Sequence, residues 1–245
     1  MRILLLAGTG EAAELARRLS DAGHAVTSSL AGATRSPRAL AGQVRSGGFG
    51  GDAGFEAWLK AHQPGLVIDA THPFAARVSL RSARICEGLG LSYLQLLRPP
   101  WPVLSEQQQY EVASVEEARA LVPPGAVVFL ATGRQTLDSF GDFSDCHLIC
   151  RQIDPPEGPF PFPNGEFRVG RPPFSVEDEV ALFKELKVDW LIVKNAGGAA
   201  SYSKIEAAGL LGIPVIFLAR PPQPDAAQVA SIAEVMEWVA RHADH

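Results

Sequence analysis

The chain has 245 residues, of which 47% are hydrophobic and 20% charged, and this composition is typical of one or two compact soluble domains. Its apolar runs, such as residues 3–7, are far shorter than the ~18 residues of a membrane-spanning helix, and no secretory h-region follows Met1. We therefore expect a cytoplasmic protein without a membrane partner. With 22 basic against 27 acidic residues, the net charge of −5 excludes the global basic field of a nucleic-acid-binding protein.

Short β-branched or Leu-rich runs alternate with amphipathic stretches in both halves of the chain, as in βαβ units around parallel sheets. In the first half we predict strands at 2–7, 25–30, 66–70 and 91–97, with helices at 11–22, 55–61 and 74–89. In the second half we predict strands at 127–131, 147–151, 190–194 and 214–219, with helices at 136–140, 176–186, 203–211 and 227–241. The pattern predicts an α/β protein of two Rossmann-like lobes, whose parallel sheets are flanked by helices, with a cleft between the lobes.

Two proline-rich segments interrupt this alternation. Prolines in Arg98-Pro-Pro-Trp-Pro stop regular structure, so we predict lobes at 1–98 and 111–245 joined by a linker at 99–110. Residues 154–171 contain five prolines, three glycines and three phenylalanines. Loops this long are usually functional lids or disordered segments.

A glycine-rich turn follows the first predicted strand. Gly8-Thr9-Gly10-Glu11 continues into Ala12-Ala13 and fits the G-x-G-x-x-A dinucleotide fingerprint. Glycines let the backbone approach a pyrophosphate, and the following helix N-terminus offers free N–H groups. The alternative is a tight turn in which Glu11 is merely a favourable first-turn carboxylate.

The end of the second predicted strand favours NADPH over NADH. The acidic residue that would bind the ribose hydroxyls of NADH is missing, because this place holds Leu30-Ala31-Gly32. Arg35 and Arg38 follow, and either suits an extra ribose phosphate. Alternatively, both arginines lie on a solvated loop.

Two further segments belong to the same predicted sheet edge. Gly48 lies in the cluster 47–51, which contains four glycines and one Phe and is either a cofactor wall or a flexible linker. Thr71 and His72 follow the strand at 66–70, where ligands of parallel sheets bind. A helix cap would also explain Thr71, and a lone histidine is more often structural, yet His72 is the preferred substrate contact of this half.

Basic residues gather at predicted strand ends of the second half. Six such positions in an acidic protein indicate a pocket for an anion with several carboxylates, which guanidinium groups bind bidentately. Taken singly, each is more simply a solvated or paired surface charge. The residues are Arg134, Arg151, Arg171, Lys194, Lys204 and Arg220.

Other enzyme classes lack their motifs here. The sequence contains no HExxH, no G-x-S-x-G elbow and no GxxxxGK[ST] loop, and its three cysteines include no CxxC pair. Tyr202 and Lys204 are two residues apart, so the Tyr-x-x-x-Lys pair of short-chain dehydrogenases is absent. We expect no metal site.

One family unites these segments. The ordered set LLLAGTGEAAELA, SLAG, SGGFGG, DATHPFA, LRPPW, FLATGR, RPPFSVEDEVALF, VKNAGG, KIEAA and IPVIFLARP resembles the precorrin-6A reductase family, which includes the cobalt-precorrin-6A reductases, over nearly the whole chain. Gly10 departs from the family pattern, which has Gly-Thr-x-Glu rather than two spaced glycines. The dinucleotide fingerprint is therefore partly accidental in this comparison.

The resemblance implies a cytoplasmic enzyme of cobalamin biosynthesis that reduces precorrin-6A with NADPH, adding a hydride to carbon 19 and a proton to carbon 18. Basic side chains, with Arg98 among them, would bind the substrate carboxylates, and the product would pass to the next corrin-pathway enzyme. The family leaves the nucleotide-binding lobe open, whereas the glycine turn and Arg35 favour the first. His72 and Lys194 are candidate proton donors beside a bound water or a substrate carboxyl. We also expect residues 154–171 to close over the bound ring.

Two other functions fit a two-lobed chain. A glycosyltransferase would bind a sugar nucleotide between paired Rossmann-like lobes, and a nucleotide-sensing module would bind NADPH without a basic pocket in the second lobe. Titration with NADPH and NADH, followed by an assay with precorrin-6A, would separate the three.

Overall fold

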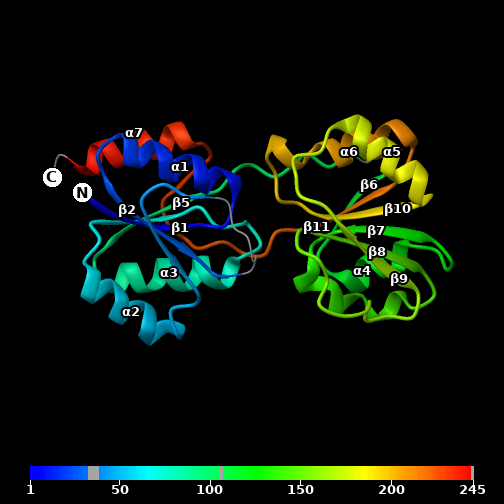
Figure 1. Cartoon of the computed structure of the whole chain (residues 1–245), viewed down its shortest axis with the longest axis horizontal. Coiled ribbons are helices and arrows are strands. Elements are labelled where there is room, and N and C mark those ends of the chain that lie inside the picture. The colour runs from blue at the N-terminus through cyan, green and yellow to red at the C-terminus, as the bar shows by residue number, and fades with distance from the viewer. Residues whose placement is uncertain (33–38, 105–106, 244–245) are drawn as a thin grey trace. The chain divides into compact units, whose positions relative to one another are not determined.

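The computed structural model describes residues 1–32, 39–104 and 107–243. The chain divides into two compact α/β units (Figure 1). Unit 1 comprises Met1–Pro99 and Pro221–His245, and unit 2 comprises Pro100–Arg220. The predicted first boundary lies within one residue of the observed one, but the prediction that 111–245 form one lobe is wrong, because the C-terminal segment packs in unit 1.

Unit 1 contains a six-stranded parallel sheet. Its order is β3-β2-β1-β4-β5-β12, the doubly wound order of dinucleotide-binding folds. The strand order reverses between β1 and β4, because β2 and β3 are added on one side of β1 and the later strands on the other. Helices α1 and α7 cover one face and α2 and α3 the other (Figure 1). The strands are β1 (Arg2–Leu6), β2 (Ala25–Leu30), β3 (Gln43–Ser46), β4 (Leu66–Asp69), β5 (Ser92–Leu96) and β12 (Gln228–Val229). The helices are α1 (Gly10–Asp21), α2 (Gly51–His62), α3 (Ala76–Gly88) and α7 (Ile232–Ala243).

The central strand of unit 1 is apolar on both faces. Ile3 and Leu5 pack with Leu15 of α1 and Val235 of α7, whereas Leu4 lies in the opposite cluster. A parallel sheet covered by helices on both sides requires such a continuous apolar strand rather than an alternating one. This burial explains why β1 is readily predicted from the sequence.

The C-terminal segment completes unit 1 through backbone pairing and amide side chains. β12 pairs in parallel with β5. Gln95 Nε2 on β5 donates to Gln223 Oε1 over 2.9 Å, and Gln223 Nε2 donates to the carbonyl of Pro73 over 3.0 Å. Residues 227–229 therefore contribute to the sheet, and the helix predicted at 227–241 begins only at Ile232.

The sheet of unit 2 has the same arrangement as that of unit 1, except that one edge strand comes from a different point of the chain. Its parallel sheet runs β9-β8-β7-β10-β11-β6, so the sixth place is filled by the strand that enters the unit first. Helices α5 and α6 pack on one face, and α4 and the 3-10 helix η2 on the other (Figure 1). The strands are β6 (Gln109–Val112), β7 (Val127–Ala131), β8 (His147–Gln152), β9 (Gly165–Val169), β10 (Trp190–Lys194) and β11 (Val215–Leu218). The helical elements are α4 (Val115–Leu121), η2 (Arg134–Phe143), α5 (Val176–Leu186), η3 (Ala199–Ser201) and α6 (Ser203–Leu211).

The sequence predicts an irregular loop over the whole proline-rich segment 154–171, but part of this segment forms a strand. Its second half is β9, which pairs in parallel with β8. The ring of Phe160 lies 4.9 Å from that of Phe167 on β9, and Arg171 approaches Asp154 to 4.0 Å. Residues 154–164 and 170–171 lie outside regular structure, so a long irregular lid is confined to 154–164.

The segment that leads into unit 2 is held by one buried amide. Asn195, which follows β10 and is 1% exposed, accepts from Trp101 N at its Oδ1 over 2.8 Å and donates from its Nδ2 to Trp101 O over 3.1 Å. The indole of Trp101 in turn donates to the carbonyl of Gly198 over 2.9 Å. The side chain of Asn195 thereby replaces a strand partner for the backbone of Trp101.

No described helix has the length and apolar character needed to cross a membrane.

We expect Asn195→Ala to lower the free energy of unfolding by about 2–4 kcal/mol, because the buried N–H and C=O of Trp101 both lose their partner. Asn164→Ala is the matched control, since Asn164 is exposed and its side-chain amide donates to Ser144 O. Urea unfolding monitored by Trp fluorescence measures both. Equal stability of the two variants would contradict the role of Asn195.

Candidate functional site

The hydroxyl of Thr9 makes two hydrogen bonds at the point where the strand order of unit 1 reverses, between β1 and β4. Thr9 is the N-cap of α1, and its Oγ1 accepts from Ala12 N over 3.1 Å. The same hydroxyl donates to the carbonyl of Ala70, just beyond β4, over 2.8 Å. One side chain therefore joins the ends of β1 and β4 to the start of α1, at the crevice where doubly wound sheets bind ligands.

Gly8 leaves this crevice open. Its φ of +140° lies in a region that side-chain-bearing residues avoid, and a Cβ placed on it would meet no atom within 4 Å. Gly10 is the first residue of α1, a position that does not call for glycine. The bare backbone at Gly8 and the amino end of α1 fit the pyrophosphate of a dinucleotide, whose negative charge is favoured at a helix N-terminus.

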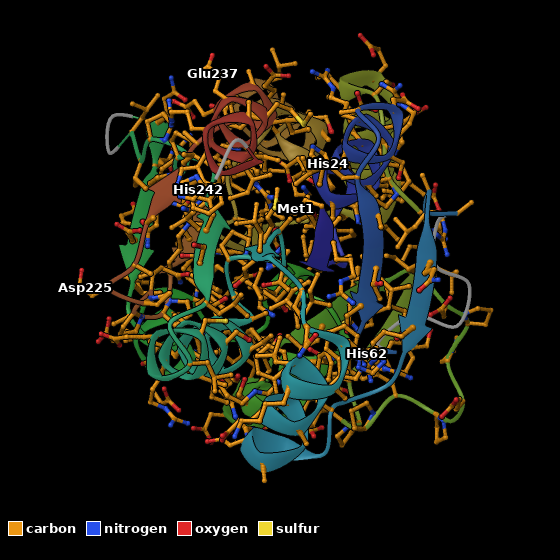
Figure 2. The ribbon with its side chains drawn as sticks, turned by 90° about the vertical axis from the view of Figure 1, so that its left-hand side faces the viewer. Met1, His24, His62, Asp225, Glu237 and His242 are labelled. Atoms are coloured by element: carbon orange, nitrogen blue, oxygen red, sulfur yellow. The ribbon has the colours of Figure 1, made fainter. Side chains whose placement is uncertain are left out.

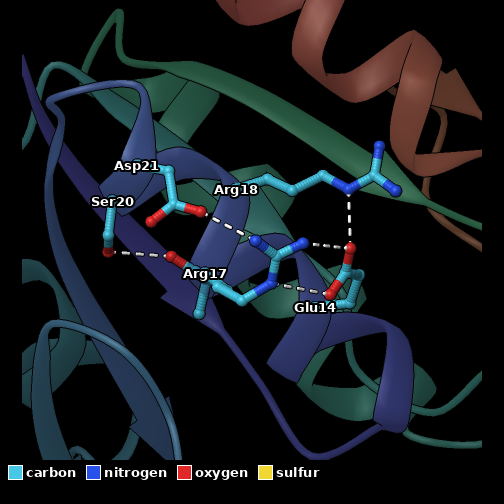
Figure 3. A network of polar contacts seen from close by, with 6 residues as sticks. Glu14, Arg17, Arg18, Ser20 and Asp21 are labelled. Atoms are coloured by element: carbon cyan, nitrogen blue, oxygen red, sulfur yellow. Dashed lines mark hydrogen bonds and ion pairs between the residues drawn. The ribbon is translucent and has the colours of Figure 1, made fainter.

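Two predicted contact residues, Glu11 and Arg98, pair with each other beside this turn. Glu11 lies in the first turn of α1, and its carboxylate forms a close ion pair with Arg98. The rest of α1 carries its own solvent-facing ion pairs, in which Arg17 bridges Glu14 and Asp21 (Figure 3). The pairing with Glu11 favours an orienting role for Arg98 at the glycine turn over direct capture of a substrate carboxylate.

The second glycine cluster lies between β3 and α2 and brings a cation that the sequence reasoning missed. Arg45 of β3 donates from Nη1 to Ser29 Oγ over 2.6 Å and from Nη2 to Gly48 O over 3.2 Å. Its guanidinium carbon lies 3.7 Å from the centre of the Phe49 ring. Arg35 and Arg38 lie outside the described residues, so Arg45 is the arginine that the structure places beside the predicted cofactor edge.

A buried carboxylate shapes the loop after β4. Asp69, 1% exposed, accepts at Oδ1 from Thr71 N over 2.9 Å and from Thr71 Oγ1 over 2.6 Å, and at Oδ2 from Tyr93 OH over 2.8 Å. Burial, with the adjacent charge of Asp69, raises the pKa of Tyr93 far above its ordinary value, so the phenol stays a donor. Thr71 is thus held in the loop by Asp69 and does not cap α3, whose N-cap is Ala75.

His72 is exposed at the carboxyl edge of the unit 1 sheet. Its Nδ1 lies 3.2 Å from Phe74 N, which donates to it, so the neutral ring carries its proton on Nε2. In the described chain, the other histidines lie elsewhere. His24 and His147 precede or begin strands, and His62 and His242 stack on tryptophans of their own helices. Figure 2 labels His24, His62 and His242. His72 is therefore the histidine available to chemistry at this edge.

A cavity of about 690 Å³ in unit 1 lies away from the glycine turn and from His72. It is lined by the carboxyl half of α3, by Tyr93 near the start of β5 and by Pro224–Ala226. The beginnings of parallel strands form the sheet edge opposite the glycine turn. Size alone therefore does not make this cavity the candidate site.

The predicted basic residues of unit 2 divide between the two faces of its sheet. Arg151 is buried and donates both ends of its guanidinium to Glu179 of α5, each over 2.9 Å. Burial, followed by the charge of Arg151, lowers the pKa of Lys204 to about 8, while Glu179 acts in the opposite direction. Arg220 donates to the carbonyls of Asn195 and Ala196. Arg151 and Arg220 therefore hold protein groups, which favours structural roles for them.

Lys194 and Arg134 lie on the other face of the unit 2 sheet, which η2 covers. Leu191 and Val193 of β10 face the α5–α6 cluster, so Lys194 points to the η2 face, and Arg134 is the exposed first residue of η2. Burial lowers the pKa of Lys194. Arg151 also lies near a strand end, as predicted for the six cations, but alternation along β8 places it on the opposite face from Lys194, where it pairs with Glu179.

Two neutral side chains lie level with Lys194 on the neighbouring strands β7 and β8. Ile192, Leu130 and Cys150 are register partners on β10, β7 and β8, and two residues further along come Lys194, Thr132 and Gln152. Thr132 and Gln152 are 4% and 7% exposed, and their side-chain polar atoms have no hydrogen-bond partner among the described residues.

Arg171, the last of the six predicted cations, follows β9 by two residues, and its side chain is 41% exposed. The described residues contain no cluster of three metal-ligating side chains.

Comparison with known proteins fits this geometry. Residues 2–240 match the family described as precorrin-6x reductase CbiJ/CobK. The chain belongs to this family. It is 41% identical to the precorrin-6A reductase of Rhodococcus erythropolis, with 97% of each chain covered, and 32% identical to the cobalt-precorrin-6A reductase of Salmonella typhimurium, with 89% and 87% covered. A solved structure of CobK precorrin-6A reductase superposes with a TM-score of 0.94 at 39% identity, over 99% and 97% of the two chains.

Membership confirms the resemblance drawn from the sequence motifs and the two-sheet α/β fold. A reductase of this family implies a nicotinamide cofactor. The glycosyltransferase and sensing-module hypotheses receive no support from these relatives.

The lowered pKa of Lys204 has a measurable consequence. Lysine in the unfolded chain has a pKa near ~10.4, so between pH ~8 and ~10.4 the folded state binds fewer protons and stability rises with pH. We expect Lys204→Met to remove this rise and to increase the free energy of unfolding at pH 7 by about 1–3 kcal/mol. Lys184→Met, at an exposed position of α5, should keep the rise. Unfolding at several pH values tests this, and parallel curves for the two variants would refute it.

Proposed function

We propose that the protein is an NADPH-dependent precorrin-6A reductase, in which unit 1 binds the nucleotide and unit 2 contributes the cations for the substrate carboxylates. The observation that carries the proposal is the open glycine turn at Gly8 and Thr9, at the chain reversal of the unit 1 sheet, in a chain of the precorrin-6x reductase family. We place the reaction in the cytoplasm, with its product passed to a later enzyme of corrin synthesis.

The residues of unit 1 fit a dinucleotide. Gly8 offers bare backbone, and Thr9 fixes the start of α1, where the pyrophosphate would lie. Glu11 and Arg98 hold the flank of the turn, and Thr71 fixes the loop beyond β4. Gly48 borders the second opening at the end of β3, because a Cβ there would also meet no atom within 4 Å.

On the substrate side, Arg134, Arg171 and Lys194 are the best candidates of unit 2. Arg134 and Arg171 are exposed, and guanidinium binds carboxylate bidentately. Thr132 and Gln152 add neutral donors and acceptors beside Lys194. We assign Lys204 and Arg151 a supporting role, since their cluster with Glu179 keeps two cations in a fixed place behind the sheet edge.

NADPH would supply the hydride, which we place on carbon 19 of the macrocycle, and a proton added to carbon 18 completes the reduction of the double bond. The protein then has to orient the substrate, exclude water and deliver that proton. The protonated ring of His72, donating from Nε2, and the ammonium of Lys194 are the two side-chain candidates, and the lowered pKa of Lys194 eases loss of its proton.

We expect purified protein to bind NADPH more tightly than NADH in a fluorescence titration and to oxidise NADPH only when precorrin-6A is added. Arg134→Gln and Arg171→Gln should each raise the KM for precorrin-6A about tenfold, since each removes a charged hydrogen bond to the substrate. Arg168→Gln is the control, because Arg168 pairs with Glu185 at the surface. Binding of NADPH without precorrin-dependent oxidation would refute the activity.

His72→Gln separates the two candidate proton donors. If His72 delivers the proton, turnover should fall about 100-fold, the typical contribution of general acid catalysis, and its dependence on pH near neutrality should disappear. NADPH binding should be retained. Unchanged turnover across pH would remove His72 as the proton donor and leave Lys194 or a bound water.

A further inference from the structure

Arg45 stands at the place where a Rossmann sheet distinguishes its dinucleotides. It is the register partner of Ser29, the last but one residue of β2, and lies on the neighbouring strand β3. In this fold the adenosine ribose lies beyond the end of the second strand, where an acid selects NADH. Here β2 ends at Leu30, so the residue that would repel a ribose phosphate is absent.

Among the residues that the structure describes, no acid neutralises the positive charge of Arg45. Its two hydrogen bonds go to neutral oxygens, the hydroxyl of Ser29 and the carbonyl of Gly48, out of the five N–H groups that a guanidinium offers. In residues 1–32, 39–104 and 107–243, no carboxylate forms an ion pair with it. The surface arginines Arg17, Arg84 and Arg119, in contrast, each pair with an acid.

Aromatic packing fixes the guanidinium. Phe49 lies under it at 3.7 Å, and the Phe49 ring packs edge-on against Phe55 at 4.7 Å and Trp58 at 5.6 Å. Together with Ser29, these rings hold the cation in one orientation. A preorganised guanidinium loses little entropy when it binds an anion.

Glycines keep the surroundings of Arg45 open. A Cβ placed on Gly47, Gly48, Gly50 or Gly51 would meet no atom within 4 Å, and Gly47, Gly50 and Gly51 have φ values of +97°, +81° and +84°. Backbone without side chains therefore borders the cation. This explains the cluster better than a flexible linker would.

We infer that Arg45 binds the phosphomonoester on the 2′ position of the adenosine ribose and thereby selects NADPH over NADH. The inference rests on the proposed function, since it needs a nicotinamide dinucleotide in unit 1. It assigns the selection to a residue of β3 that the fingerprint after β2 does not include. Arg45 is then a binding residue for the cofactor and takes no part in the chemical step.

The test measures binding by titration calorimetry, without the macrocyclic substrate. Adenosine 2′,5′-bisphosphate and NADPH carry the 2′-phosphate, and ADP and NADH lack it. We expect Arg45→Gln to weaken binding of the first pair about 10- to 100-fold, the value of one charged bidentate contact, and to leave binding of the second pair unchanged. Arg45→Lys should fall between, because it keeps the charge without the planar fork.

Two matched variants sharpen the test. Arg17→Gln, on the outer face of α1, should change neither pair, and thermal unfolding of each variant verifies its fold. Arg35→Gln tests the arginine after β2. Retained preference for the phosphorylated ligands in Arg45→Gln, or loss of preference in Arg35→Gln alone, overturns the inference. If the unsubstituted protein binds the two pairs equally, the NADPH proposal itself fails, which separates the two outcomes.

Discussion

The glycine turn of unit 1 depends on the hydrogen bonds of one hydroxyl. Thr9 Oγ1 accepts from Ala12 N and donates to Ala70 O, so the glycine turn, the start of α1 and the loop after β4 cannot shift independently. The loop after β4 carries Thr71 and His72 and is fixed a second time by the buried Asp69. Because Gly8 has no side chain and Thr9 is held on both sides, the turn is already shaped for the pyrophosphate that we propose there. Such preorganisation reduces the entropy lost on binding.

Both sheets reach the same strand order by different chain paths. Unit 1 takes its sixth strand from residues 228–229 and unit 2 takes its own from residues 109–112. Edge strands this short have little apolar area of their own, and side chains therefore secure the segments that carry them. Gln95 and Gln223 connect the C-terminal segment to the loop at Pro73, and Asn195 holds the backbone of Trp101. Polar side chains with both a donor and an acceptor suit this task because they replace a missing strand partner.

The sequence predicts the central elements well and the edges poorly. The predicted bounds of β2, β7, β10, α5 and α6 agree with the structure, because apolar strands buried on both faces and amphipathic helices have strong periodic signals. The prediction omits all four edge strands, β3, β6, β9 and β12, and the short helix α4, since these are short, partly polar runs, and the pairing of each edge strand comes from a neighbouring strand. Of the candidate site, the glycine turn, Thr71 and His72 are brought to one edge, as predicted. The pairing of Arg151 with Glu179 was not predictable, because their contact joins a strand to a helix 28 residues away.

The two kinds of cation in this structure explain why counting strand-end arginines overestimates a binding site. Arg151 is buried opposite a carboxylate, and removing either partner would leave the other charge buried and uncompensated, so its charge serves the fold. Arg45 is half-buried, its hydrogen-bond partners within the described part of the chain are neutral, and burial lowers its pKa. An anionic ligand would relieve that cost at Arg45 and would gain nothing at Arg151. Local charge balance, rather than position along the strand, therefore distinguishes a binding residue from a structural one.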